Sequence, residues 1–296
     1  MEWELQVAAS KLLKRAAQAG VAAYVDSREE SKEKSNLVEV KRPHATVKPL
    51  FLVHAVGGDS DCYYELARSL DYQGAVFGLQ MDETVPGTVE GMAEEYVEVI
   101  KGIHPDGSYL LGGWSMGGVV AYEMARQLKA ANCNVDPLLM IDSYCPNSIP
   151  EFAERMTPAD EKVLLQTLAA ELGITDAGMS AAERATLDEM SVETLMTIFV
   201  RLGREQKLLP AEFDLERRFE TVLKNSRAVR SYRALPAEIE IQLIRAQENE
   251  HPDWSLGWGS LAKRVTVREL PGNHFSLMRQ PHVLGVAEVI SRLISA

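Results

Sequence analysis

The sequence predicts an α/β fold in which helices cover both faces of a mainly parallel sheet. From about residue 47 onward, short apolar runs alternate with segments of helical periodicity. A repeated strand-then-helix order requires crossover connections, and these produce parallel strands with helices on both faces. The chain has 296 residues, of which 46% are apolar, and this is enough for one large domain with its own core.

The N-terminal 45 residues are expected to lie outside this domain, which we place at residues 46–296. Residues 4–24 carry apolar side chains at helical spacing and predict an amphipathic helix. Residues 26–36 are polar and charged, which is typical of a linker. The helix fits the end of an upstream domain, a surface for homodimer formation, or packing on its own domain, and the sequence leaves these open.

The first half of the domain is predicted to contain four short strands, each an apolar run. They cover residues 50–54, 75–79, 108–112 and 137–141, with helices expected at 62–70, 89–100 and 119–128. In a parallel α/β sheet, reactive groups collect at the carboxyl ends of the strands. Val56, Ser115 and Asp142 each follow such an end, so we expect a site there.

Residues 146–235 carry no strand pattern and predict a helical lid inserted after the strand that ends at Asp142. Helical periodicity covers residues 159–172, 181–189, 192–204 and 212–230. Strands resume at 239–245 and 265–270, and a final helix is expected at 283–295. Because strands resume, an insertion within the sheet is favoured over an independent helical domain.

Gly113-Trp114-Ser115-Met116-Gly117 fits the nucleophile elbow, Gly-x-Ser-x-Gly. An apolar strand precedes the pentapeptide and a helical pattern follows it, which is the context that the motif needs. The two glycines allow the strand and the helix to pass close together. Ser115 is therefore predicted to be a nucleophile exposed above the edge of the sheet.

A serine hydroxyl needs a base within hydrogen-bond reach, and the base needs an acid that orients it. His274 follows the last expected strand on a glycine-containing loop, and Asp142 directly follows an apolar strand. The chain order Ser, Asp, His predicts an α/β-hydrolase fold. Glu248, Glu250 and Asp253 are alternative acids. Asp142 is preferred because the other three lie in a polar loop, where surface charge is usual.

The backbone N–H groups of Val56 and Met116 are the expected oxyanion hole. Ala55-Val56-Gly57-Gly58 follows the first strand of the domain and presents free N–H groups at the edge of the sheet. Met116 directly follows the predicted nucleophile. Two such donors stabilise the charge that develops on a carbonyl oxygen during acyl transfer.

Composition excludes several classes of partner. With 31 basic and 43 acidic residues the net charge is −12, so nucleic acid is not expected as a partner. No run approaches the about 18 apolar residues that span a membrane, and no signal-peptide pattern begins the chain, so a cytoplasmic location is expected. Cys62, Cys133 and Cys145 lack metal-ligand spacing and are expected to be free thiols, with no metal site.

From about Pro49 to Ala296 the sequence resembles the thioesterase domains that end modular polyketide synthases and nonribosomal peptide synthetases. The resemblance rests on His54–Gly58, Gly113–Gly118 with Val120–Ala125, Leu139–Ser143, Gly257-Trp258, and Pro271–Met278 with Pro281. This chain has Ala55 and Asn273 where that family often has proline and aspartate. Neither is a position of the triad.

The resemblance implies a chain-releasing thioesterase without a bound cofactor. An upstream acyl or peptidyl carrier protein would deliver a polyketide or peptide acyl chain as a thioester on its phosphopantetheine arm. The chain would pass to Ser115 and leave by hydrolysis or macrocyclisation. An acid placed directly after the strand before the lid resembles the chain-terminating type, since free-standing editing thioesterases usually carry it after the next strand. An editing thioesterase, a carboxylesterase and a non-catalytic hydrolase-fold scaffold are the alternatives.

Overall fold

The computed structural model describes residues 36–44, 47–82, 84–105, 108–150, 156–211 and 213–294. Two compact units make up this part of the chain. The sheet unit comprises residues 35–155 and 224–296, and the described part of the helical unit lies within residues 156–223. The helix expected at residues 4–24 and its linker lie outside the described residues, so they stay predictions.

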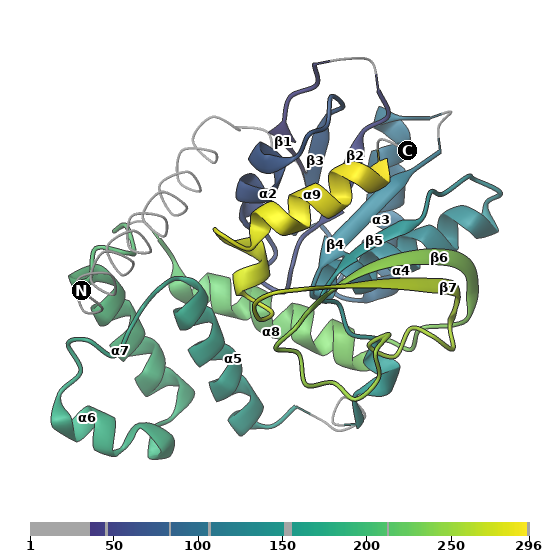
Figure 1. The fold of residues 1–296 in the computed structure, drawn as a ribbon. Helices are drawn as coiled ribbons and strands as arrows, with labels where there is room; N and C mark the ends of the chain where they lie inside the picture. Colours follow the sequence, from purple (N-terminus) through teal and green to yellow (C-terminus); the bar gives the residue numbers. More distant parts are fainter. Residues whose placement is uncertain are drawn as a thin grey trace. The chain divides into compact units, whose positions relative to one another are not determined.

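The sheet unit contains a seven-stranded sheet of order β1-β3-β2-β4-β5-β6-β7 (Figure 1). Its strands are β1 (Leu37–Lys41), β2 (Leu50–Val53), β3 (Val76–Leu79), β4 (Leu110–Trp114), β5 (Leu138–Ile141), β6 (Ala237–Ala246) and β7 (Ala262–Leu270). All neighbouring strands are parallel except β1 and β3, which are antiparallel. The predicted mainly parallel sheet is confirmed, and the carboxyl ends of β2, β4, β5, β6 and β7 share one edge.

Helices cover both faces of this sheet (Figure 1). One face carries α2 (Tyr64–Ser69) and α9 (Val283–Ile294), and the other carries α3 (Val89–Ile103) and α4 (Met116–Ala130). Short 3₁₀ helices lie at Asp61–Tyr63, Pro146–Ser148 and Ser276–Met278. None of the helices in the described part of the chain is long and apolar enough to cross a membrane.

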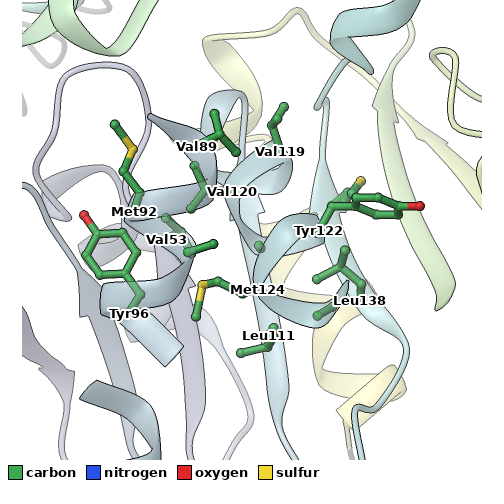
Figure 2. Close-up of a cluster of buried hydrophobic side chains, with 14 of the residues drawn as sticks. Val53, Val89, Met92, Tyr96, Leu111, Val119, Val120, Tyr122, Met124 and Leu138 are labelled. Carbon is green, nitrogen blue, oxygen red and sulfur yellow. The ribbon is translucent and has the colours of Figure 1, made fainter. Parts of the chain in front are cut away.

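The two faces of the sheet have separate apolar cores, and β2 contributes to both. Leu50 and Leu52 pack with α2 and α9, whereas Phe51 and Val53 pack with α3 and α4. Side chains alternate between faces along a strand, so a strand covered on both sides must be apolar throughout. Figure 2 shows the second core, in which α3 and α4 side chains meet β2, β4 and β5.

The sheet begins earlier than the boundary expected at residue 46, and this part of the prediction is wrong. β1 pairs with β3 at the edge of the sheet, with Leu37 opposite Leu79 and Val38 opposite Gly78. Its residues are half-buried, apart from the exposed Glu39. An edge strand needs no continuous apolar run and commonly carries charges such as Glu39 and Lys41. Because of this mixed pattern, the sequence alone did not identify residues 37–41 as a strand.

The helical unit lies in the chain between β5 and β6, and its described residues contain no strand, as predicted. Its helices are α5 (Pro158–Glu171), α6 (Ala181–Ala185) and α7 (Val192–Glu205), followed by α8 (Leu215–Ser231), which ends in the sheet unit. Thr157 and Ser180 each begin a helix with a capping box. These boxes satisfy backbone N–H groups at helix starts, so the sequence itself fixes where α5 and α6 begin.

A buried carboxylate ties the end of α8 to α4 within the sheet unit. Glu123 is 1% exposed and accepts from Arg126 through two hydrogen bonds of 2.7 Å, from Gln127 at 3.0 Å and from the Tyr232 hydroxyl at 2.8 Å. Burial raises the pKa of Glu123, but the hydrogen bonds from Arg126, Gln127 and Tyr232 outweigh it and leave the pKa below its usual value.

We expect Arg126→Met to lower the free energy of unfolding by about 2 kcal/mol at pH 7, because a buried carboxylate loses its cation. A depressed pKa gives stability that is lost as the pH falls through it. The variant raises the pKa of Glu123, so this loss should begin at a higher pH. Urea unfolding between pH 4 and 7 measures both effects. Lys129→Met, which alters an exposed cation of the same helix, is the control, and equal curves for the two variants would contradict the prediction.

Candidate active site

Ser115 lies between β4 and α4 in a strained backbone conformation. Its φ is 57° and its ψ is −126°, a region that residues with a side chain rarely adopt. A Cβ added to Gly113 would lie 2.1 Å from the carbonyl carbon of Gly117, and one added to Gly117 would lie 2.2 Å from the Val53 oxygen. Both glycines are therefore required by close backbone contacts. This is the strand–turn–helix geometry that the pentapeptide predicts.

The side chains of Ser115, His274 and Asp142 form one hydrogen-bonded row. His274 Nε2 lies 3.0 Å from Ser115 Oγ, and His274 Nδ1 lies 2.9 Å from Asp142 Oδ2. With the proton assigned to Nδ1, this nitrogen donates to the carboxylate and Nε2 accepts from the serine hydroxyl. Such a row pairs a nucleophile with a base and the base with an orienting acid.

Asp142 is fully buried, and further donors surround its carboxylate. Asp142 Oδ1 accepts from the Ala246 N–H at 3.0 Å and from Asn249 Nδ2 at 2.9 Å. Burial alone raises the pKa of Asp142, but the hydrogen bonds from His274, Ala246 and Asn249 together lower it below its usual value. The carboxylate is therefore ionised at neutral pH, and its Oδ2 faces the imidazole.

The three alternative acids lie elsewhere in the loop after β6. Glu248 is exposed, and its Oε2 accepts from Asn273 Nδ2 at 3.2 Å. Glu250 is also exposed. Asp253 accepts from the N–H groups of Ser255 at 2.8 Å and Gly257 at 3.0 Å, so it stabilises the turn that follows. Of the four acids that the sequence offers, the one hydrogen-bonded to His274 in the structure is Asp142.

Sequence reasoning missed Asn249, because an amide in a polar loop carries no chemical signal. The loop around it is built on Arg245, which is 9% exposed. Nη2 of Arg245 donates to the carbonyl of Asn249 at 2.9 Å and to that of His251 at 2.8 Å. These two bonds from a largely buried guanidinium fix the loop that presents Asn249 to Asp142. The sequence does place Arg245 near the end of a strand and shortly before a polar loop, and this pattern could have indicated that the loop is fixed.

Trp114 and Asn273 fix the loop that carries His274. Trp114 Nε1 donates to the His274 carbonyl at 3.0 Å, and the two rings lie with centroids 5.1 Å apart. Asn273 Oδ1 accepts from the N–H groups of Phe275 at 3.2 Å and Ser276 at 3.0 Å. An aspartate oxygen accepts the same two bonds, so asparagine at this position leaves the turn intact.

Val56 and Met116 follow the ends of the neighbouring parallel strands β2 and β4. Tyr63 bridges these ends, because its hydroxyl donates to the Val53 carbonyl at 2.5 Å and accepts from the Trp114 N–H at 2.8 Å. Met116 is the first residue of α4, where a helix leaves its N–H groups without partners inside the helix. The predicted oxyanion donors thus come from two backbone segments that one buried side chain connects.

Two further expectations concern cysteines and metals. The described residues contain no group of three or more His, Cys, Asp or Glu side chains arranged to hold a metal ion. All three cysteines are free thiols. Cys145 is buried, and burial raises its pKa to about 11. A thiol with this pKa is neutral at pH 7 and is a poor nucleophile, so Cys145 is a packing residue.

A serine elbow after β4, an acid after β5 and a histidine after β7 define the chain as an α/β-hydrolase. Residues 48–294 match the family model of the thioesterase domain, and the chain belongs to that family. The fold alone does not identify the bond that is cleaved, whereas membership of the family indicates a thioester.

Similar sequences occur within large synthases. A dimodular nonribosomal peptide synthase of Bacillus subtilis is 39% identical over 126 residues, which make up 41% of this chain and 5% of the synthase. The non-reducing polyketide synthase stmB of Aspergillus ustus is 28% identical over 282 residues, which make up 88% of this chain and 14% of the synthase. The chain therefore spans a small part of the length of these relatives.

Similar solved structures agree with this. A four-domain nonribosomal peptide synthetase, bound to AMP and glycine, is 30% identical with a TM-score of 0.75, and the match covers 90% of this chain and 21% of the synthetase. The NocB thioesterase domain, in covalent complex with a fluorophosphonate nocardicin G analog, is 26% identical with a TM-score of 0.62. That match covers 85% of this chain and 96% of the NocB domain.

Replacing Asn249 tests how Asp142 is held. We expect Asn249→Leu to raise the pKa of Asp142, because one of its donors is lost while the Ala246 N–H remains. The stability given by the ionised carboxylate is lost as the pH falls through its folded pKa, so the loss should begin at a higher pH than in the wild type. Urea midpoints between pH 3 and 7 measure this shift. Glu250→Gln, in the same loop, is the control, and an unshifted Asn249→Leu profile would contradict the prediction.

Proposed function

We propose that this chain is a chain-releasing thioesterase of polyketide or nonribosomal peptide biosynthesis. It takes an acyl chain from the phosphopantetheine thioester of a carrier protein onto Ser115 and releases it by hydrolysis or macrocyclisation. The observation that carries the proposal is the hydrogen-bonded row of Ser115, His274 and Asp142 in a member of the thioesterase family. The relatives support the biosynthetic setting, since they are synthases of both kinds.

In the first half of the reaction, Ser115 Oγ attacks the thioester carbonyl while His274 Nε2 takes the hydroxyl proton. The new C–O bond gives a tetrahedral intermediate, whose oxyanion accepts from the N–H groups of Val56 and Met116. Collapse breaks the C–S bond, and His274 returns the proton to the departing thiolate of the pantetheine arm. Asp142 stabilises the imidazolium throughout without taking its proton.

In the second half, His274 acts again as a base, now on the group that attacks the acyl-enzyme. The bond from the acyl carbon to Ser115 Oγ then breaks, and His274 returns the proton to Oγ. Attack by water gives a carboxylic acid, and attack by a hydroxyl or amine of the chain itself gives a lactone or lactam. The insertion predicted at residues 146–235 acts as a lid that shapes the space around the acyl chain. Its helical character supports this role. No metal or bound cofactor takes part in these steps.

The proposed partner is an upstream acyl or peptidyl carrier protein. This chain resembles one fifth of a four-domain nonribosomal peptide synthetase, with the match covering 21% of that protein. A similar arrangement here would place a carrier domain before the thioesterase, either on the same chain or on a separate one.

Mass spectrometry of the intact protein with acyl-pantetheine mimics tests the function. The wild type should gain one acyl group at Ser115, and Ser115→Ala should gain none. Asp142→Asn should acylate about ten-thousandfold more slowly, because an amide favours the wrong histidine tautomer. If the folded wild type forms no adduct and shows no turnover across a broad panel, the thioesterase proposal fails. Faster turnover of simple esters than of thioesters would instead favour a carboxylesterase.

The amphipathic pattern of residues 4–24 supports a second proposal, a homodimer formed through the N-terminal segment. We expect removal of residues 1–34 to convert a dimer into a monomer in solution, measured by light scattering coupled to size exclusion. This deletion leaves Asn36, whose carbonyl accepts from the Gln80 N–H at 2.9 Å, so the edge of the sheet is kept. An unchanged number of subunits would rule out this role.

A further inference from the structure

We propose that Asn225 is a positioning residue for the oxyanion hole, through the turn that follows β2. Asn225 lies on α8 and is fully buried. Its Nδ2 donates to the carbonyl oxygen of Val56 at 2.9 Å, across 169 positions of the sequence. The inference rests on the proposed function, because it requires that the Val56 N–H stabilises an oxyanion.

The turn that contains Val56 is held on both sides by other bonds. Gly58 N donates to the Ala55 carbonyl at 3.0 Å, and Met81 N donates to the Gly58 carbonyl at 2.7 Å. His54 Nδ1 lies 2.6 Å from the Ala55 carbonyl. These contacts fix the ends of the turn, and the bond from Asn225 is the one that reaches the carbonyl in its middle.

The contact at the carbonyl of Val56 controls its N–H for a geometrical reason. The N–H and the C=O of one residue belong to successive rigid peptide planes that share a single Cα. Holding the C=O therefore restricts the backbone rotations that would turn the N–H of Val56 away. An oxyanion hole depends on donors that are already aimed before the charge develops. A side chain that fixes this turn contributes to the rate without touching the substrate.

The other atom of the Asn225 amide argues for function rather than stability. Asn225 Oδ1 is buried and has no hydrogen-bond partner among the described residues. A buried oxygen without a partner lowers stability, and an apolar side chain of similar size avoids that loss. Packing alone therefore does not explain an asparagine at position 225, whereas the bond from its Nδ2 to the Val56 carbonyl does.

The neighbouring residue, Lys224, provides a matched control on the same helix. Lys224 Nζ donates to the carbonyl of Val85 at 3.0 Å. This is the same kind of bond as that of Asn225, from an α8 side chain to a backbone carbonyl within the sheet unit. Val85, however, lies outside the turn between residues 54 and 58. Lys224→Met thus removes an anchor of α8 and leaves the oxyanion turn untouched.

The test uses the full chain and compares Asn225→Leu and Asn225→Ala with Lys224→Met. The measurements are kcat and KM for an acyl-pantetheine thioester, the rate at which a fluorophosphonate labels Ser115, and the midpoint of thermal unfolding. We expect Asn225→Leu to lower kcat and the labelling rate about 30-fold at unchanged KM, somewhat less than loss of an oxyanion donor. Asn225→Ala should show the same loss of kcat even if its cavity lowers the midpoint, and Lys224→Met should keep kcat within about twofold.

Each other outcome has a definite meaning. Wild-type kcat in Asn225→Leu and Asn225→Ala overturns the inference and leaves the proposed function standing. The inference also fails if Lys224→Met loses as much activity as the Asn225 variants, or if their loss appears in KM alone, because the contact is then structural. A wild-type protein that is not labelled at Ser115 overturns the proposed function and this inference together.

Discussion

The buried charge of Asp142 is the constraint on which the site depends. A carboxylate removed from water is stable only when hydrogen-bond donors surround it. Here the donors come from the histidine loop, from the backbone at the end of β6 and from the amide of Asn249. The last of these requires a fixed loop, and Arg245 fixes it by donating to its carbonyls. The loop after β6 is thus held in the conformation in which Asn249 donates to Asp142.

The strained turn at Ser115 is the second constraint, and the core beside it supports the turn. A backbone conformation as rare as that of Ser115 persists only when the surrounding structure determines it. In this chain α4 begins directly after the serine, and Val120 and Met124 pack with Val53 and Leu111 of the sheet (Figure 2). Tyr63 adds a polar connection between the ends of β2 and β4. The backbone at Ser115 is therefore supported by an apolar core and by the buried hydroxyl of Tyr63.

The sequence predicts those parts of the fold and the site that depend on neighbouring residues, and it misses those that depend on contacts between distant positions. The central strands are continuous apolar runs bounded by turns, and the helices have clear periodicity, so both are readable locally. β1 is not, because Glu39 and Lys41 interrupt its apolar residues at an exposed edge. Ser115 and His274 are readable because motif and chain order identify them. Asn249 and Asn225 are not, since their partners lie 107 and 169 positions away and an amide announces no chemistry.

The part of α8 that lies in the sheet unit is held by contacts within that unit. Within the sheet unit, Lys224 of α8 contacts Val85, Asn225 of α8 contacts Val56, and Tyr232, which directly follows α8, contacts Glu123. These contacts fix the last turns of α8, and Ser115, His274 and Asp142 all lie within the sheet unit. Side chains within residues 156–223 can then change while the hydrogen bonds among Ser115, His274 and Asp142 keep their geometry. This is the physical condition under which one fold serves many substrates. Asn225 marks the limit of that freedom, because there the helix that leaves the insertion contacts the carbonyl of Val56 directly.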